Sequence, residues 1–311
     1  MPIVAANGMN IAYVENGDRA APAILLIMGL GMQLTAWPDS FCEGLADHGF
    51  RVVRFDNRDV GLSTKIRSVG PVAVAAAFAR ALAGLRVKAP YLLADMARDA
   101  IGLMDALGIA QAHIVGASMG GMIAQIVAAE HPERVLSLTS IMSSSGAPDL
   151  PRGDPRLIET LAWPRLGFNR ERAIRQAMDF YRRIGSPGFP TSEEQLRAKV
   201  ERSIDRCYYP AGMGRHLLAI LASGSRVELL ARIRAPTLVL HGDDDPLVPV
   251  EAGRDTAARI PGARLRIISG MGHDLAPGLA PILMDAIAEH CIAATEASER
   301  SRVARSKGRA R

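Results

Sequence analysis

Residues 113–121 read His113-Ile114-Val115-Gly116-Ala117-Ser118-Met119-Gly120-Gly121, a short apolar run that stops at a serine held between small residues. In the pattern Gly-x-Ser-x-Gly the serine lies at a sharp, strained turn from a strand to a helix, and glycines are needed where a β-carbon would collide with neighbouring chain. The residues that follow are apolar at helical spacing, so the Met119 amide lies at a helix start and can donate to a developing oxyanion. Ser118 is therefore the candidate nucleophile, and a glycine-rich turn without chemistry is the alternative.

Apolar runs and helical patterns alternate along much of the chain. Residues 2–16 alternate around Asn7-Gly8, which predicts a β-hairpin. Short continuous apolar runs, typical of strands buried on both faces of a parallel sheet, occur at 23–28, 51–56, 113–117, 135–142, 236–241 and 264–268. Helices are predicted between them, for example at 38–47 and 91–107. This alternation predicts an α/β fold with a mostly parallel sheet flanked by helices.

The alternation stops after the strand at 135–142. Prolines at 148, 151, 155 and 164 interrupt the chain, and helical segments without a convincing strand follow near 170–183, 192–206 and 211–222. The prediction is a core of residues 1–144 and 232–296, with an inserted helical cap at 145–231. Ligand sites in parallel sheets lie at the carboxyl ends of the strands, so a cap inserted there would roof the site.

An acid and a histidine follow two later strands. Asp245 lies in Gly242-Asp243-Asp244-Asp245-Pro246, and His273 closes Gly270-Met271-Gly272-His273. A serine hydroxyl is a weak nucleophile until a base takes its proton, and the base needs an acid to fix its tautomer. We therefore predict a catalytic set of Ser118, Asp245 and His273. Asp243 and Asp244 are alternative acids, and His290, the other histidine after the acid, is predicted in a helix that reaches the surface.

Further residues are candidates for contacts with a substrate. The loop Gly29-Leu30-Gly31 follows a predicted strand, so the Leu30 amide is the candidate for a second oxyanion donor beside Met119. Large side chains near the predicted strand ends and in the cap are tentative substrate contacts: Trp37, Trp163, Tyr208, Tyr209, Met213 and Leu247. Apolar residues on cap helices are also common as plain packing, which is the alternative for this set.

Composition narrows the remaining classes. The formal charge of +5 comes from six basic residues at 300–311; without them 31 basic residues face 32 acidic ones. We therefore predict a basic, disordered tail at 297–311 and no nucleic-acid partner. The sequence shows no signal peptide and no apolar run of membrane-spanning length, which predicts a cytoplasmic protein without a membrane partner. Three distant cysteines have no metal-ligand spacing, so no metal is expected. Monomer and homodimer both stay open.

The sequence resembles the α/β-hydrolase superfamily over about residues 1–295. The superfamily shows Gly-x-Ser-x-Gly, then Gly-x-x-Asp before a proline, then Gly-His, in the order nucleophile, acid, base. Segments 28–31, 55–63 and 117–121 look like the bacterial carboxylesterase branch that includes the aclacinomycin methylesterases. The chain departs from many relatives at Met28, where they have histidine before the oxyanion glycine, and its tail has no counterpart there.

The resemblance implies a reaction as well as an eight-stranded fold. Ser118 would attack the carbonyl of a small-molecule ester, His273 would carry the proton, and no cofactor would be required. Lactonases, carbon–carbon bond hydrolases and perhydrolases share this triad and remain alternatives. A ligand-binding protein of the same fold with slow turnover is the alternative outside the enzymes.

Overall fold

The apolar runs form one eight-stranded sheet in a computed structural model, which describes all residues except 67–75, 78, 82, 163–168 and 310–311. The strand order is β1-β2-β4-β3-β5-β6-β7-β8. The β1–β2 and β2–β4 pairs are antiparallel, and every later pair is parallel. The strands are β1 (Ile3–Ala6), β2 (Met9–Asn16), β3 (Ala23–Ile27), β4 (Arg51–Phe55), β5 (Ala112–Ala117), β6 (Val135–Ile141), β7 (Thr237–Gly242) and β8 (Arg264–Ile268). The predicted α/β class with a mostly parallel eight-stranded sheet is confirmed.

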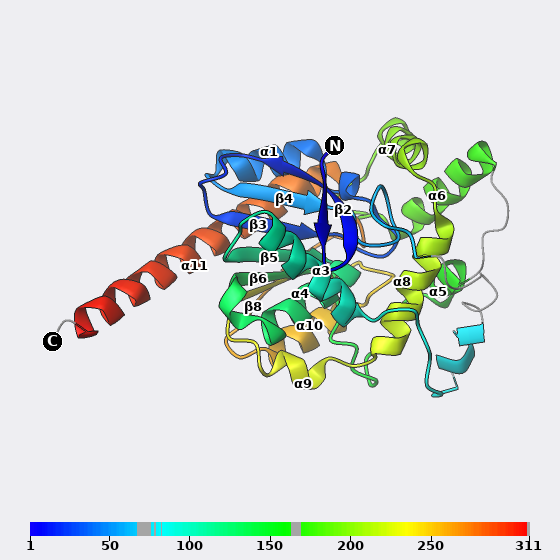
Figure 1. Cartoon of the computed structure of the whole chain (residues 1–311). Helices are drawn as coiled ribbons and strands as arrows, with labels where there is room; N and C mark the ends of the chain where they lie inside the picture. The colour runs from blue at the N-terminus through cyan, green and yellow to red at the C-terminus, as the bar shows by residue number, and fades with distance from the viewer. Residues whose placement is uncertain (67–75, 78, 82, 163–168, 310–311) are drawn as a thin grey trace.

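Helices cover both faces of this sheet, and others lie to one side of it (Figure 1). They are α1 (Asp39–Asp47), α3 (Leu93–Ala106), α4 (Met119–Glu130), α5 (Pro155–Ala162), α6 (Arg170–Ile184), α7 (Glu193–Arg206), α8 (Pro210–Ser223), α9 (Val227–Leu230), α10 (Val250–Arg259) and α11 (Ala280–Arg309). Short 3₁₀ helices lie at Leu34–Ala36, Pro132–Arg134 and Pro277–Leu279. Helices α1 and α11 pack on one face, and α3 and α4 on the other.

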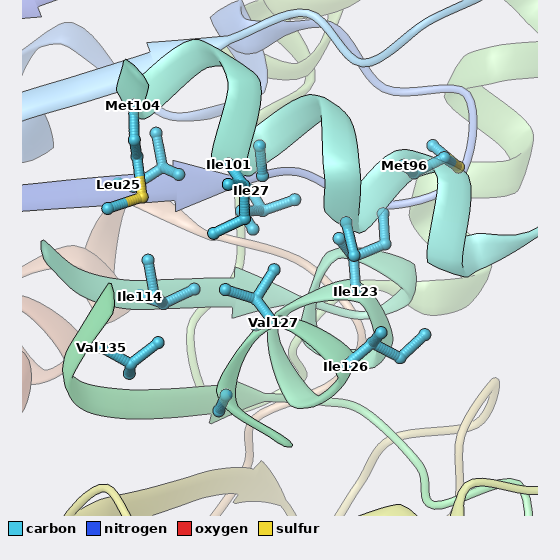
Figure 2. Packing of buried hydrophobic residues seen from close by; sticks show 14 of the residues in the cluster. Leu25, Ile27, Met96, Ile101, Met104, Ile114, Ile123, Ile126, Val127 and Val135 are labelled. Carbon is cyan, nitrogen blue, oxygen red and sulfur yellow. The ribbon is translucent and has the colours of Figure 1, made fainter. Parts of the chain in front are cut away.

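Strand β3 shows why its sequence has no alternation of polar and apolar residues. Ile24 and Leu26 point to the core beneath α1 and α11, whereas Leu25 and Ile27 point to the core beneath α3 and α4. Figure 2 shows Leu25 and Ile27 among side chains of α3 and α4. Both faces of the strand are thus buried, as a central parallel strand requires. Packing against the two cores holds the strands in register, so their carboxyl ends lie together at one edge of the sheet, where a site can form.

The segment between β6 and β7 is helical in its described residues. Helices α5 to α8 gather on one side of the molecule, at the right in Figure 1. Helix α5 was not predicted, because the prolines at 151 and 155 indicated a break. Pro155 is its first residue, a place where the missing N–H is not needed. The alanine-rich segment at 71–89 lies partly outside the described residues. Its Ala77 and Val87 pack against Leu218 of α8.

Helix α11 departs from the sequence expectation at two places. His290 is 3% exposed rather than near the surface, because the first half of α11 packs on the sheet with Leu283, Ile287 and Cys291 buried. The described helix also continues to Arg309, where a disordered tail was predicted, and it projects from the body in Figure 1. Among the described residues, Pro277–Arg300 is the stretch long and apolar enough to cross a membrane, but its window is 44% buried in the fold.

Candidate active site

The turn at Ser118 is held in a conformation that side chains rarely adopt. Ser118 follows β5 and precedes α4 with φ 56° and ψ −121°, a strained combination for a residue with a β-carbon. A β-carbon at position 116 would lie 2.2 Å from the carbonyl oxygen of Gly120, and one at position 120 would lie 2.0 Å from that of Ile27. Both glycines are therefore required by close backbone contact, as the sequence pattern predicted. The turn lifts the hydroxyl above the sheet.

The structure brings the three predicted residues together. Ser118 Oγ lies 2.9 Å from Nε2 of His273, and Nδ1 of the same imidazole lies 2.7 Å from Oδ2 of Asp245. The Nδ1–H donor on the carboxylate leaves Nε2 as the acceptor for the serine hydroxyl. This tautomer places a base beside Ser118. Asp243 and Asp244, the alternative acids, are exposed, and Asp243 accepts from the Gly270 N–H.

Asp245 is buried as a charged group with a full set of donors. Its Oδ1 accepts from the backbone N–H groups of Leu247 at 2.9 Å and Val248 at 2.8 Å. Burial by itself would raise the pKa of Asp245, but the neighbouring His273 and hydrogen bonds from His273 and the Val248 N–H hold that pKa well below its usual range. The carboxylate is thus ionised at neutral pH and can stabilise a positive charge on the imidazole.

The cap holds the loop that carries the histidine. The His273 N–H donates to the Ile184 carbonyl at 2.7 Å, and the Gly188 N–H donates to the Gly270 carbonyl at 2.9 Å. Ser186 adds a side-chain link, because its hydroxyl donates to Asp274 at 2.5 Å and accepts from the Gly272 N–H at 2.9 Å. The segment after α6 is therefore part of the frame around the base.

The predicted oxyanion loop is held from two sides. A β-carbon at Gly29 would lie 3.1 Å from the Ser118 β-carbon, so this loop passes directly beside the serine. Asn57 Nδ2 donates to the Met28 carbonyl at 2.9 Å, and the Gly31 N–H donates to Nδ1 of His216 at 3.2 Å. Leu30 and Met119 both line the cavity at Ser118. Both residues thus lie where their backbone N–H groups could bind an oxyanion, as predicted.

Buried ion pairs tie the cap to the loop after β4. Arg215 of α8 holds Asp59 through two bonds of 2.8 Å, and Tyr91 donates to the same carboxylate at 2.6 Å. Arg206 of α7 reaches Asp56 at 2.7 Å. These ion pairs hold the cap on the loop after β4. Removing one partner would leave the other buried and unpaired, which is costly.

Ser118 and His273 open into a cavity of about 350 Å³ between the sheet and the cap. Its lining is mostly apolar and holds four titratable side chains among the described residues: Tyr181, Lys199, His273 and Asp274. Six methionines line it, Met28, Met32, Met119, Met122, Met142 and Met213. Methionine is flexible and polarisable, so this wall can adapt to large and irregular apolar groups.

The six residues predicted as tentative substrate contacts lie in different places. Met213 and Leu247 line the cavity at Ser118. Tyr208 and Tyr209 line an adjoining cavity of about 130 Å³ instead. Trp37 was wrongly predicted: it is 0% exposed and stacks on Phe41 at 5.5 Å between ring centroids, inside the core beneath α1. Trp163 lies outside the described residues.

The methionine wall was missed at the sequence level, although it left a signal. Met28 and Met142 directly follow β3 and β6, and Met119 follows Ser118, so each stands at the carboxyl end of a strand. Met122 lies one turn along α4 from Ser118. A residue type repeated at the ends of neighbouring parallel strands marks a shared surface. No group of three or more His, Cys, Asp or Glu suited to a metal occurs in the described part of the chain.

Comparisons with known proteins identify the family of the chain. Residues 22–276 match the family model described as alpha/beta hydrolase fold. The chain therefore belongs to the α/β-hydrolase family, and it is an enzyme of the α/β-hydrolase type. The predicted resemblance to bacterial carboxylesterases is confirmed by methylesterases among the relatives of the chain.

Curated relatives include two rhodomycin D methylesterases. Rhodomycin D methylesterase DauP of Streptomyces sp. (strain C5) is 30% identical, covering 90% of this chain and 94% of its own length. The corresponding methylesterase of Streptomyces peucetius is 29% identical with the same coverage. A poly(3-hydroxyalkanoate) depolymerase of Ectopseudomonas oleovorans is 32% identical over 87% of this chain and 86% of its own. Relatives of this kind share the hydrolase class and differ in substrate.

Solved structures share the fold. An enol-lactonase from Burkholderia xenovorans LB400 has a TM-score of 0.71 at 23% identity, covering 93% of this chain and 99% of that one. A meta-cleavage product hydrolase from Pseudomonas fluorescens IP01 has a TM-score of 0.72 at 20% identity, covering 93% and 97%. At these identities the comparison supports the architecture alone.

Proposed function

We propose that this protein is a serine carboxylesterase that works through an acyl-enzyme. Ser118 Oγ attacks the ester carbonyl while His273 Nε2 takes its proton, and the imidazolium then gives that proton to the departing alkoxide. Water, deprotonated by the same nitrogen, attacks the acyl-enzyme and releases the acid. Asp245 holds the imidazole in the required tautomer and stabilises its charged form.

One observation carries this proposal: the unbroken path from Ser118 Oγ to His273, at 2.9 Å, and on to Asp245, at 2.7 Å, at the wall of a cavity. Hydrogen bonds of this length allow proton transfer without rearrangement. The strained backbone at Ser118 supports the same role, since strain of this kind collects at functional sites.

The backbone amides of Leu30 and Met119 are assigned to the oxyanion. Met119 is the first residue of α4, where an N–H has no partner within the helix and the helix dipole favours negative charge. Leu30 belongs to the loop that passes beside Ser118. Two amides directed at the developing oxygen anion stabilise the transition state, whatever acid or alcohol the ester contains.

The assigned substrate class is an ester with a large apolar acyl part. The methionine-lined cavity supports a bulky apolar group, and the relatives named as rhodomycin D methylesterases support a small alcohol on the leaving side. Met213 and Leu247 are the assigned contacts for the apolar part. Losing such a contact costs about 1–3 kcal/mol of discrimination between substrates.

A substrate panel tests the proposal and separates it from the other reactions of this fold. Methyl esters, aryl esters, lactones and a vinylogous diketone should be compared by kcat/KM, and we expect methyl and aryl esters to lead. A fluorophosphonate should label the wild type, fail to label Ser118→Ala, and still label Ser225→Ala, a matched change at an exposed serine. Cleavage of the diketone above all esters would contradict the esterase assignment, and binding of esters without turnover would indicate a binding protein.

A further inference from the structure

Three cavities meet at Lys199. The cavity at Ser118 adjoins one of about 130 Å³ and another of about 430 Å³ between the cap and the core. The lining residues common to all three are Ala36, Tyr181 and Lys199. Lys199 belongs to the cap helix α7 and is half-buried. Its side chain thus stands at the junction through which the apolar cavity continues away from the serine.

The ammonium group of Lys199 has no acceptor in the described part of the protein. Its Nζ lies 4.5 Å from the centre of the Tyr181 ring, a cation–π contact that uses the charge and leaves the N–H donors free of oxygen partners. Within the described residues it makes neither a salt bridge nor a hydrogen bond, unlike other cations of the third cavity. Arg182 pairs with Glu193 there at 2.6 Å, and Arg202 lies 3.4 Å from Asp39.

The carboxylate that shares the cavity wall with Lys199 is engaged elsewhere. Asp274 accepts from the Ser186 hydroxyl at 2.5 Å as part of the frame behind the histidine. Burial raises the pKa of Asp274 and the charge of Lys199 acts to lower it, but the two groups form no salt bridge, so the ammonium keeps its N–H donors for another acceptor. Lys199 is therefore the one lysine or arginine among the described residues that line the cavity at Ser118. A half-buried ammonium in such surroundings is incompletely solvated, and an anionic oxygen would satisfy it best.

We propose that Lys199 binds the distal carboxylate of the substrate, so that the preferred ester is the monoester of a dicarboxylic acid. The ester lies at Ser118, the apolar chain passes along the methionine wall, and the carboxylate meets Nζ at the junction. The compact ammonium offers three donors and accepts a carboxylate in many orientations, which suits acyl parts of different shape. This inference rests on the proposed function and names the acid that the esterase selects.

Matched substrates test the assignment. Monomethyl dicarboxylates of increasing chain length should be compared with methyl esters of monocarboxylic acids of the same length, as a ratio of kcat/KM values. The ratio should favour the carboxylate series in the wild type, fall about tenfold or more in Lys199→Met, and fall further in Lys199→Glu. Arg197 is an exposed residue of the same helix and pairs with Glu201, so Arg197→Met should keep the wild-type ratio. High salt should reduce the preference.

A binding measurement separates this inference from the esterase reaction. Calorimetry with the Ser118→Ala protein should show tighter binding of a monomethyl dicarboxylate than of its neutral partner, and the added change Lys199→Met should remove the difference. If that holds while the wild type hydrolyses no ester, Lys199 recognises a carboxylate and the esterase assignment fails. If esters are hydrolysed and neither the kinetic ratio nor the binding difference depends on Lys199, the esterase assignment stands and this inference is overturned.

Discussion

His216, on the cap helix α8, accepts a hydrogen bond from the backbone N–H of Gly31, in the loop after β3, at 3.2 Å. The other nitrogen of the ring donates to the Arg58 carbonyl at 2.7 Å. Burial lowers the pKa of His216 to about 4, so the ring is neutral at neutral pH and supplies one acceptor and one donor. His216 thereby holds the backbone next to Leu30 and links it to the loop after β4.

Replacing this histidine should weaken catalysis without touching the proposed triad. His216→Phe leaves the Gly31 N–H and the Arg58 carbonyl unpaired, so the loop should relax and kcat should fall about tenfold or more, with KM changing little. Steady-state kinetics on a small activated ester checks this below the melting temperature of the variant. His48→Phe, at an exposed position, is the control. An equal loss in both variants would argue against a positioning role.

The proposed triad should behave as one unit. Ser118→Ala and His273→Ala should each lower kcat by about 10⁴-fold or more, and Asp245→Asn somewhat less, while the double change Ser118→Ala and His273→Ala should be hardly worse than either alone. Turnover and circular dichroism together check this. A folded Ser118→Ala protein with near wild-type turnover would remove the proposed mechanism.

Two buried histidines should make the protein less stable in mild acid. Burial lowers the pKa values of His113 and His216 to about 4, whereas histidines of the unfolded chain titrate near 6.5. Between these values the unfolded state binds more protons, so the free energy of unfolding should fall as pH drops from about 6.5 to 4, by up to about 1.4 kcal/mol per pH unit for each histidine. Urea unfolding at neutral and acidic pH checks the slope.

A variant isolates the share of one histidine in that slope. His113→Asn should give a shallower loss of stability in acid than the wild type, and His48→Asn should leave the slope unchanged. The comparison is needed because burial raises the pKa values of Asp99 and Asp274, which act in the opposite direction at acidic pH. Identical slopes in the wild type and His113→Asn would assign the acid sensitivity to other groups.

The glycine after the nucleophile should tolerate no side chain. In Gly120→Ala the new β-carbon would meet the Ile27 carbonyl oxygen at 2.0 Å, which forces α4 away from β3. We expect a loss of about 2–3 kcal/mol or more in stability, together with lower turnover. Gly278→Ala, whose nearest neighbour would be the Phe189 ring at 3.4 Å, should be nearly neutral. Chemical unfolding of both proteins checks the contrast.

The core elements were predictable because each one follows from a local pattern. The run at 23–28 is apolar without alternation, and the structure buries its two sides in two different cores. The candidate site was predictable for a related reason: parallel strands end at one edge, so Ser118, Asp245 and His273 had to meet there if the strands pair in order.

Long-range packing set the parts that the sequence did not reveal. Trp37 comes shortly after the predicted oxyanion loop, as a pocket residue would, yet its stacking on Phe41 places it in the core. Tyr208 and Tyr209 lie on the cap, but which cavity they line depends on where α8 rests, and buried pairs such as Arg215 with Asp59 decide that. Charged residues distant in sequence give no local signal of such pairing.

The bonds between the cap and the histidine loop restrict how molecules enter and leave. If the cap lifted at its Ile184–Gly188 side, it would break the link to the His273 backbone and displace the base from Ser118. Each substrate or product that passed by that route would therefore separate His273 from Ser118 and interrupt catalysis. A route that keeps the base in place would run between α7 and the loop at residues 32–36, past Lys199, where the two adjoining cavities lie. Substrate and product would then pass beside the cap, while the cap stays bonded to the loop that carries His273.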